Sequence, residues 1–76
     1  MNQFKVSEAK WQLLEPRKLN LIGTQIVIVY SRELATTAPY HVHRTTACHA
    51  QTDSLEEAKQ LALIVVNELM EMGVDP

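Results

Sequence analysis

Apolar residues recur with helical spacing along the last third of the chain. Stepping about 100° per residue from Leu55 places the apolar side chains as far as Met72, apart from Ile64, on one arc of roughly 200°. Asp53 and Ser54 are good N-cap residues, and Gly73 ends the pattern. The sequence predicts a C-terminal amphipathic helix, whose apolar arc is wide enough to need cover from a second helix or another molecule.

Two patterns typical of strands precede this helix. Residues Thr24–Tyr30 are mostly β-branched or aromatic and apolar on both faces, which predicts a strand that is covered on both sides or that contacts a partner, such as a second copy of the chain. Tyr40–Arg44 and Ala47–Thr52 alternate small or apolar residues with polar ones, which predicts a hairpin. A turn with an odd number of residues would pair His41 with His49 and direct Cys48 inward.

The N-terminal third predicts a second helix. Val6–Leu14 contains helix-compatible residues, Ser7 is a candidate cap, and Pro16 prevents continuation. Residues 31–39 are typical of a loop. The resulting order α-β-β-β-α predicts an α+β fold in which a three-stranded antiparallel sheet packs against helices on one face. We expect one domain over residues 1–76.

Composition narrows the classes of function. The single cysteine excludes an internal disulfide and favours a reducing compartment, and no apolar run is long enough to span a membrane. We therefore expect a cytoplasmic protein. Residues 1–52 carry six basic side chains against three acidic ones, whereas residues 53–76 carry one against six. The acidic helix argues against nucleic-acid binding, which needs a basic face.

The predicted order of elements is that of double-stranded-RNA-binding domains. The segment SLEEAKQLA at residues 54–62 resembles the start of their second helix, and three residues match that family: Ala58, Lys59 and Ala62. Leu55 and Glu56 stand where the family has its first two phosphate-contacting lysines. The resemblance implies the family's fold, and a degenerate double-stranded-RNA-binding domain is the alternative function.

A second resemblance is to the N-terminal domain of HicB-type antitoxins. The stretches CHAQTDSLEEA at residues 48–58 and LMEMGVDP at residues 69–76 are similar to that family's pattern of a Cys, an Asp-Thr pair, a Glu-Glu-Ala helix and a Gly-Pro ending. The Pro-Gly segment before the Cys and the DNA-binding half are missing. The resemblance implies an inhibitor that blocks a partner through protein–protein contact.

The chemistry-bearing residues gather in the predicted hairpin. His41, His43 and His49 would share one exposed sheet face, and such a cluster could suit zinc. The sequence favours the alternative, a solvated His-rich strand face, because no CxxC or HxxxH spacing is present. Cys48 is expected to be buried and inert. We therefore expect no catalytic residue, no metal and no cofactor.

The polar face of the predicted helix is acidic around one apolar residue, Ile64. Apolar residues surrounded by acids can contact a partner, although single exposed ones are common. We expect four residues to bind a partner: Glu57, Ile64, Glu68 and Glu71. The chain is predicted to be a non-enzymatic, protein-binding inhibitor of a nuclease or nucleic-acid-binding machine, either antitoxin-like or a phage or mobile-element inhibitor of the anti-CRISPR kind, with self-association into a homodimer.

Overall fold

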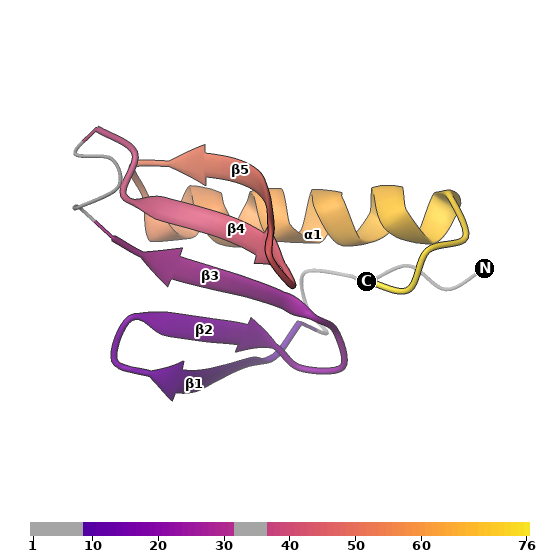
Figure 1. Ribbon diagram of the computed structural model, residues 1–76, viewed down its shortest axis with the longest axis horizontal. Coiled ribbons are helices and arrows are strands. Elements are labelled where there is room, and N and C mark those ends of the chain that lie inside the picture. The colour runs from indigo at the N-terminus through magenta and orange to yellow at the C-terminus, as the bar shows by residue number, and fades with distance from the viewer. Residues whose placement is uncertain (1–8, 32–36) are drawn as a thin grey trace.

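Five strands and one helix make up the described part of the chain, residues 9–31 and 37–76 of a computed structural model (Figure 1). Each strand pairs antiparallel with the next, so the order in the sheet is the order in the chain. The elements are β1 (Trp11–Glu15), β2 (Lys18–Leu21), β3 (Ile26–Tyr30), β4 (Tyr40–Arg44), β5 (Ala47–Thr52) and α1 (Leu55–Glu71).

The predicted three-stranded fold with two helices is wrong, and its error lies in the N-terminal third. Residues 11–14 of the predicted Val6–Leu14 helix belong to strand β1, residues 6–8 lie outside the described residues, and β2 was not predicted. In the β1–β2 pair, Trp11 lies opposite Leu21 and Leu13 opposite Leu19. These apolar side chains therefore form cross-strand pairs. The pairs join residues that are not close in the sequence, so the spacing of residues within one short segment does not reveal them.

Strand β3 is the central strand of the sheet, and the apolar residues on both of its faces are at least half-buried. Ile26 and Ile28 are buried in the core, whereas Val27 and Val29 are half-buried and lie across from His43 and His41 of β4. Both edges of β3 are paired, with β2 and with β4. The predicted strand is therefore confirmed, and its partners are its own neighbours in the chain.

Helix α1 packs across β3, β4 and β5 on one face of the sheet, and the β1–β2 hairpin extends beyond it (Figure 1). Leu61, Val65 and Met70 are partly buried against the core, so the sheet itself covers much of the wide apolar arc. None of the described helices is long and apolar enough to cross a membrane. The buried core consists of Leu21, Ile26, Ile28, Val42, Ala58, Ala62, Leu63, Val66 and Leu69.

Both predicted ends of the helix are confirmed. Ser54 is the N-cap, and its Oγ accepts a hydrogen bond from the backbone N–H of Glu57 at 3.3 Å. At the other end, Gly73 has φ of 76° and donates to the Met70 carbonyl at 3.1 Å. The N–H of Val74 donates to the Leu69 carbonyl at 2.9 Å, which completes a Schellman motif.

The chain after the helix returns to the sheet. The guanidinium of Arg44, at the end of β4, donates to the backbone carbonyl of Asp75 through Nε at 2.9 Å and through Nη2 at 2.7 Å. The N–H of Gln25 donates to the Pro76 carbonyl at 2.9 Å. These bonds hold the C-terminal residues against the ends of β3 and β4, so the helix is fixed to the sheet at both of its ends.

Candidate functional site

The four residues predicted to bind a partner lie on one exposed stripe of α1. Glu57, Ile64, Glu68 and Glu71 follow one another at intervals of seven, four and three residues, which keeps them on one side of an α-helix. All four are exposed, whereas the opposite side of the helix is buried against the sheet. The structure brings these residues together as predicted, and we call this stripe the acidic helix face.

The charges of the acidic helix face are not compensated locally. Its last turn contains Glu68 and Glu71 and no basic residue, although the C-terminal end of a helix carries a partial negative charge. Over residues 9–31 and 37–76, the ion pair between Lys18 and Glu15 at 3.6 Å, at the β1–β2 turn, is the one salt bridge present. Glu68 and Glu71 therefore lower the stability of the helix slightly, whereas Glu57, in the first turn, is favourable to the helix dipole.

Ile64 lies in the middle of the acidic helix face and is 52% exposed. Its neighbours one turn away in each direction, Gln60 and Glu68, are also exposed. A protein surface placed against this side of the helix would remove an isoleucine from water, which is favourable. The arrangement is an apolar residue with the neutral Gln60 on one side, Glu68 on the other, and Glu57 and Glu71 two turns away in either direction.

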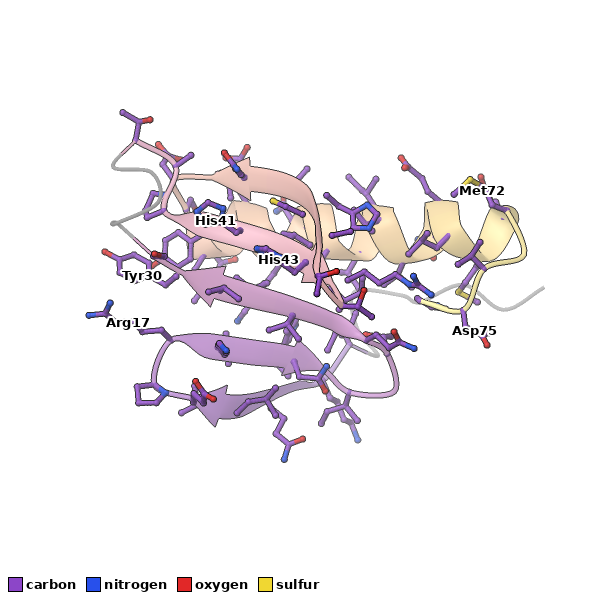
Figure 2. The ribbon with its side chains drawn as sticks, in the orientation of Figure 1. Arg17, Tyr30, His41, His43, Met72 and Asp75 are labelled. Carbon is purple, nitrogen blue, oxygen red and sulfur yellow. The ribbon has the colours of Figure 1, made fainter. Side chains whose placement is uncertain are left out.

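A second group of side chains lies on the opposite side of the sheet from α1. His41 and His43 extend from β4 on that open face (Figure 2). Cys48 pairs with His43 across the hairpin and is exposed. One ligand atom from each of the three side chains lies within 4.8 Å of the other two. We call these three residues the His–Cys cluster.

Two predictions about this hairpin are wrong. His41 lies opposite Gln51 instead of His49, and Cys48 is exposed on the histidine face instead of packed inward. The cause is the turn, which contains two residues, Thr45 and Thr46, instead of an odd number. A β-bulge between Val42 and His43 then restores the pairing of Val42 with Ala50 by leaving one extra residue, His49, in β5.

One signal in the sequence could have placed Cys48 correctly. Two-residue loops are the commonest hairpin connections, and such a loop between Arg44 and Ala47 puts His43 directly opposite Cys48. The absence of Gly or Asn obscured this turn. Thr45 nevertheless adopts a positive φ of 54°, the conformation that Gly and Asn favour, and its hydroxyl donates to the Arg44 carbonyl at 2.6 Å.

The two imidazoles of the His–Cys cluster differ in their surroundings. His41 is only 3% exposed, and its Nε2 is buried without a hydrogen-bond partner among the described residues. Its ring centroid lies 6.0 Å from that of His43. Burial lowers the pKa of His43 below its ordinary value, and electrostatic repulsion between its protonated form and the neighbouring imidazoles of His41 and His49 lowers it further. His43 is therefore mainly neutral at pH 7.

A recess of about 370 Å³ lies beside the β1–β2 turn, which sequence reasoning did not find because β1 and β2 were not predicted. Its wall includes two tyrosines whose ring centroids are 4.9 Å apart, and the Arg17 guanidinium lies 6.0 Å from the nearer ring, that of Tyr30 (Figure 2). The recess suits an apolar group beside an anionic one. Its lining residues are Leu13, Pro16, Arg17, Lys18, Leu19, Ile28, Tyr30, Tyr40 and Leu55.

Comparisons of this chain with known protein families, with curated proteins and with solved structures found no match. The resemblance to double-stranded-RNA-binding domains rested partly on the predicted Val6–Leu14 helix, and residues 11–14 of that segment belong to strand β1. The resemblance to HicB-type antitoxins rests on its short motif alone. The function is therefore argued from the chain's own surfaces.

Proposed function

We propose that this chain is a non-enzymatic, protein-binding inhibitor that occupies a basic surface of a nucleic-acid-processing partner with its acidic helix face. The observation that supports this proposal is Ile64, half exposed at the centre of glutamates that no described cation pairs with. Single exposed apolar residues are common. Here, however, Glu68 and Glu71 also oppose the helix dipole, and their cost in stability favours a role in contact for the surface around Ile64.

The two parts of this surface would act at different stages of binding. Acidic side chains accelerate encounter with a basic surface, and proteins that process nucleic acids have such surfaces because they bind phosphates. Ile64 would then be buried at the centre of the contact, where anchoring residues contribute most of the affinity. A partner covered in this way could not admit its nucleic acid. Antitoxin-like proteins and phage or mobile-element inhibitors of the anti-CRISPR kind act by such occupation.

The same proposal places the chain in the cytoplasm. Cys48 is a free, exposed thiol, and an exposed thiol persists in a reducing compartment more readily than in an oxidising one. Nucleic-acid-processing partners are found in that compartment as well. Labelling of Cys48 with a membrane-impermeant thiol reagent, compared between intact and lysed host cells, would test the placement.

Self-association into a homodimer also stays a proposal. The surface that could form the dimer is smaller than the sequence suggested. Strand β3 has both edges paired, so it cannot extend a sheet into a second copy. The large apolar side chains still exposed at the helix are Ile64, at 52%, and Met72, at 68%. Sedimentation velocity at high micromolar concentration should detect the dimer, and a single monomer species at that concentration would count against it.

Partner capture from the native host provides the direct test of function. The parent chain and two variants of the acidic helix face, Ile64→Asp and Glu68→Lys, serve as baits, and captured proteins are identified by mass spectrometry. Glu15→Lys is the matched control, because it makes the same charge reversal on the exposed β1–β2 hairpin, away from α1. We expect one nucleic-acid-processing protein to be captured by the parent and the control and lost from both variants.

The captured protein must then be inhibited. Its nuclease or nucleic-acid-binding activity should fall when the purified parent chain is added, and Ile64→Asp should inhibit far less, provided that circular dichroism shows it folded. Capture by all four baits alike would exclude the acidic helix face as the interface. Capture without any loss of the partner's activity would exclude inhibition.

A further inference from the structure

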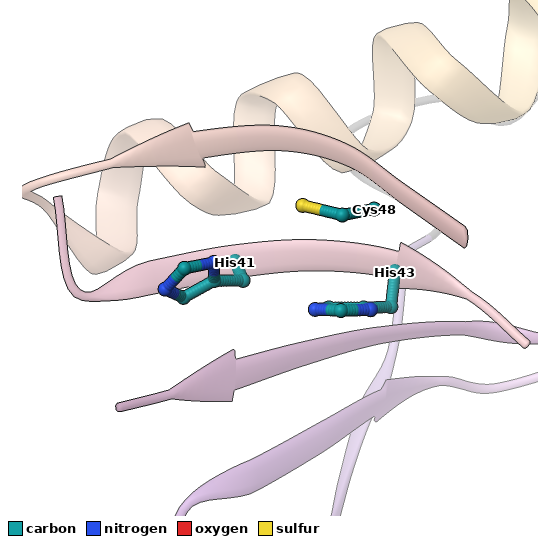
Figure 3. Close-up of side chains that lie close together, drawn as sticks. All are labelled: His41, His43 and Cys48. Carbon is teal, nitrogen blue, oxygen red and sulfur yellow. The ribbon is translucent and has the colours of Figure 1, made fainter. Parts of the chain in front are cut away.

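The His–Cys cluster has the donor set and the spacing of a transition-metal site. His41 and His43 extend from alternate positions of one strand, and Cys48 approaches from the paired strand (Figure 3). Their ligand atoms lie within 4.8 Å of one another. In a tetrahedral zinc site, neighbouring nitrogen and sulfur ligands are roughly 3.3–3.6 Å apart. Side-chain rotation that closes the gaps by about 1 Å would therefore complete the site.

A solvated strand face does not account for His41. A histidine on such a face would be exposed and hydrogen-bonded to water. His41, in contrast, is only 3% exposed, and its Nε2 has no hydrogen-bond partner among the described residues. Burying a polar nitrogen without a partner costs free energy. The position of His41 therefore needs a reason other than solubility, and metal binding by the imidazoles of this strand is such a reason.

The backbone holds the cluster rigidly while leaving it open on one side. Strand β4 is paired along both edges, with β3 and with β5, so the spacing of His41 and His43 is fixed. The thiol of Cys48 is exposed, and Nε2 of Gln51 contacts its sulfur at 3.9 Å. An ion can therefore reach the cluster from solvent, and the exposed thiol can rotate to meet it.

We propose that His41, His43 and Cys48 bind one zinc ion through two imidazole nitrogens and one thiolate, with the fourth position open to water or to an external ligand. Imidazole and thiolate donors suit zinc, whereas magnesium and calcium require oxygen ligands that the cluster lacks. On binding, the Cys48 S–H bond breaks, sulfur forms the bond to zinc, and the proton passes to solvent.

This site is independent of the proposed inhibitory function. His41 and His43 lie on the sheet face that α1 does not cover (Figure 2). The acidic helix face is the exposed side of α1, opposite the side that is buried against the sheet. Zinc would join β4 to β5 next to their turn and so stabilise the hairpin. Loss of zinc binding and loss of partner binding can therefore be separated by variants in the two surfaces.

Metal titration of tag-free protein, stripped with a chelator under reducing conditions, tests the proposal. We expect isothermal titration with Zn²⁺ to show one site per chain. With Co²⁺ as a spectroscopic probe, we expect intense visible absorption of a tetrahedral site and a near-ultraviolet band from sulfur-to-cobalt charge transfer. Cys48→Ser should abolish that band, and Cys48→Ser and His43→Asn should each weaken zinc binding by more than about tenfold.

His49→Asn is the matched control, because it removes a neighbouring histidine that is outside the proposed ligand set. It should retain the stoichiometry and affinity of the parent. Cys48 and His49 are exposed, so these substitutions should leave the fold intact, which circular dichroism would verify. The proposal is overturned if the parent binds no zinc at micromolar concentrations, if Cys48→Ser binds it equally well, or if only His49→Asn loses it.

Discussion

His43 and Cys48 lie directly opposite each other across the β4–β5 hairpin, on the sheet face that α1 does not cover. Their pairing follows from the two-residue turn at Thr45 and Thr46, and the bulge at His49 keeps the rest of β5 in register with the core. One turn geometry therefore brings a thiol to two imidazoles and still places Val42 and Ala50 on the side of the helix.

Zinc should raise the thermal stability of the chain. Because an ion that binds only the folded state stabilises it by mass action, free zinc at a hundred times the dissociation constant adds roughly 2.7 kcal/mol. For a domain of this size, that corresponds to an increase in Tm of more than about 10 °C. Differential scanning calorimetry of the parent with zinc and with chelator measures the effect. Cys48→Ser should show a much smaller shift, and equal shifts would argue against a site that includes Cys48.

Replacing Thr45 with Asn should stabilise the protein. Thr45 has φ of 54°, a conformation that is costly for a β-branched residue and tolerated by Asn. We expect a gain of about 0.5–1 kcal/mol in the free energy of unfolding, measured by urea denaturation. Thr46→Asn is the control, since Thr46 is exposed in the same turn without a positive φ. A gain in both variants, or in neither, would contradict the explanation from backbone strain.

Replacing Gly73 with Ala should destabilise the helix end through the backbone alone. Gly73 has φ of 76°, and a Cβ built there meets no atom within 4 Å. The cost is therefore that of a left-handed conformation for an L-residue, about 1 kcal/mol in the free energy of unfolding. Gly73→Asn should cost less, because Asn tolerates that conformation. Urea denaturation measures whether Gly73→Ala lowers the free energy of unfolding more than Gly73→Asn does. If space around Gly73 limited the side chain, the larger Asn would instead be the more destabilising of the two.

The chain should not bind duplex RNA or DNA at about 150 mM salt. Glu56 and Glu57 are exposed in the first turn of α1, where they repel phosphate. Gel-shift assays at increasing salt concentration measure any binding to duplex RNA or DNA. Affinity that falls steeply with salt would identify contacts to phosphate. Binding that persists at physiological salt and disappears on mutation of Lys59 or Arg44 would show a nucleic-acid surface that these glutamates do not block.

Local signals were sufficient for the C-terminal half of the fold. The cap at Ser54 and the stop at Gly73 act within one or two turns of the helix, so their chemistry could be read from neighbouring residues. The alternation in Tyr40–Arg44 and Ala47–Thr52 gave the bounds of β4 and β5 for the same reason. The acidic helix face follows as well, because helical spacing alone places its four residues together.

The sequence by itself therefore determined the helix, its capping residues, the strands of the C-terminal half and the acidic helix face. Only the tertiary structure decided that Trp11–Glu15 is a strand, because its backbone pairs with β2 and Trp11 packs against the core, and sequence spacing does not encode either contact. It also decided the His–Cys cluster. The side of the sheet that Cys48 occupies depends on one residue of register, and the bulge at His49 lets Cys48 lie beside His43 while Val42 and Ala50 still pack into the core under the helix.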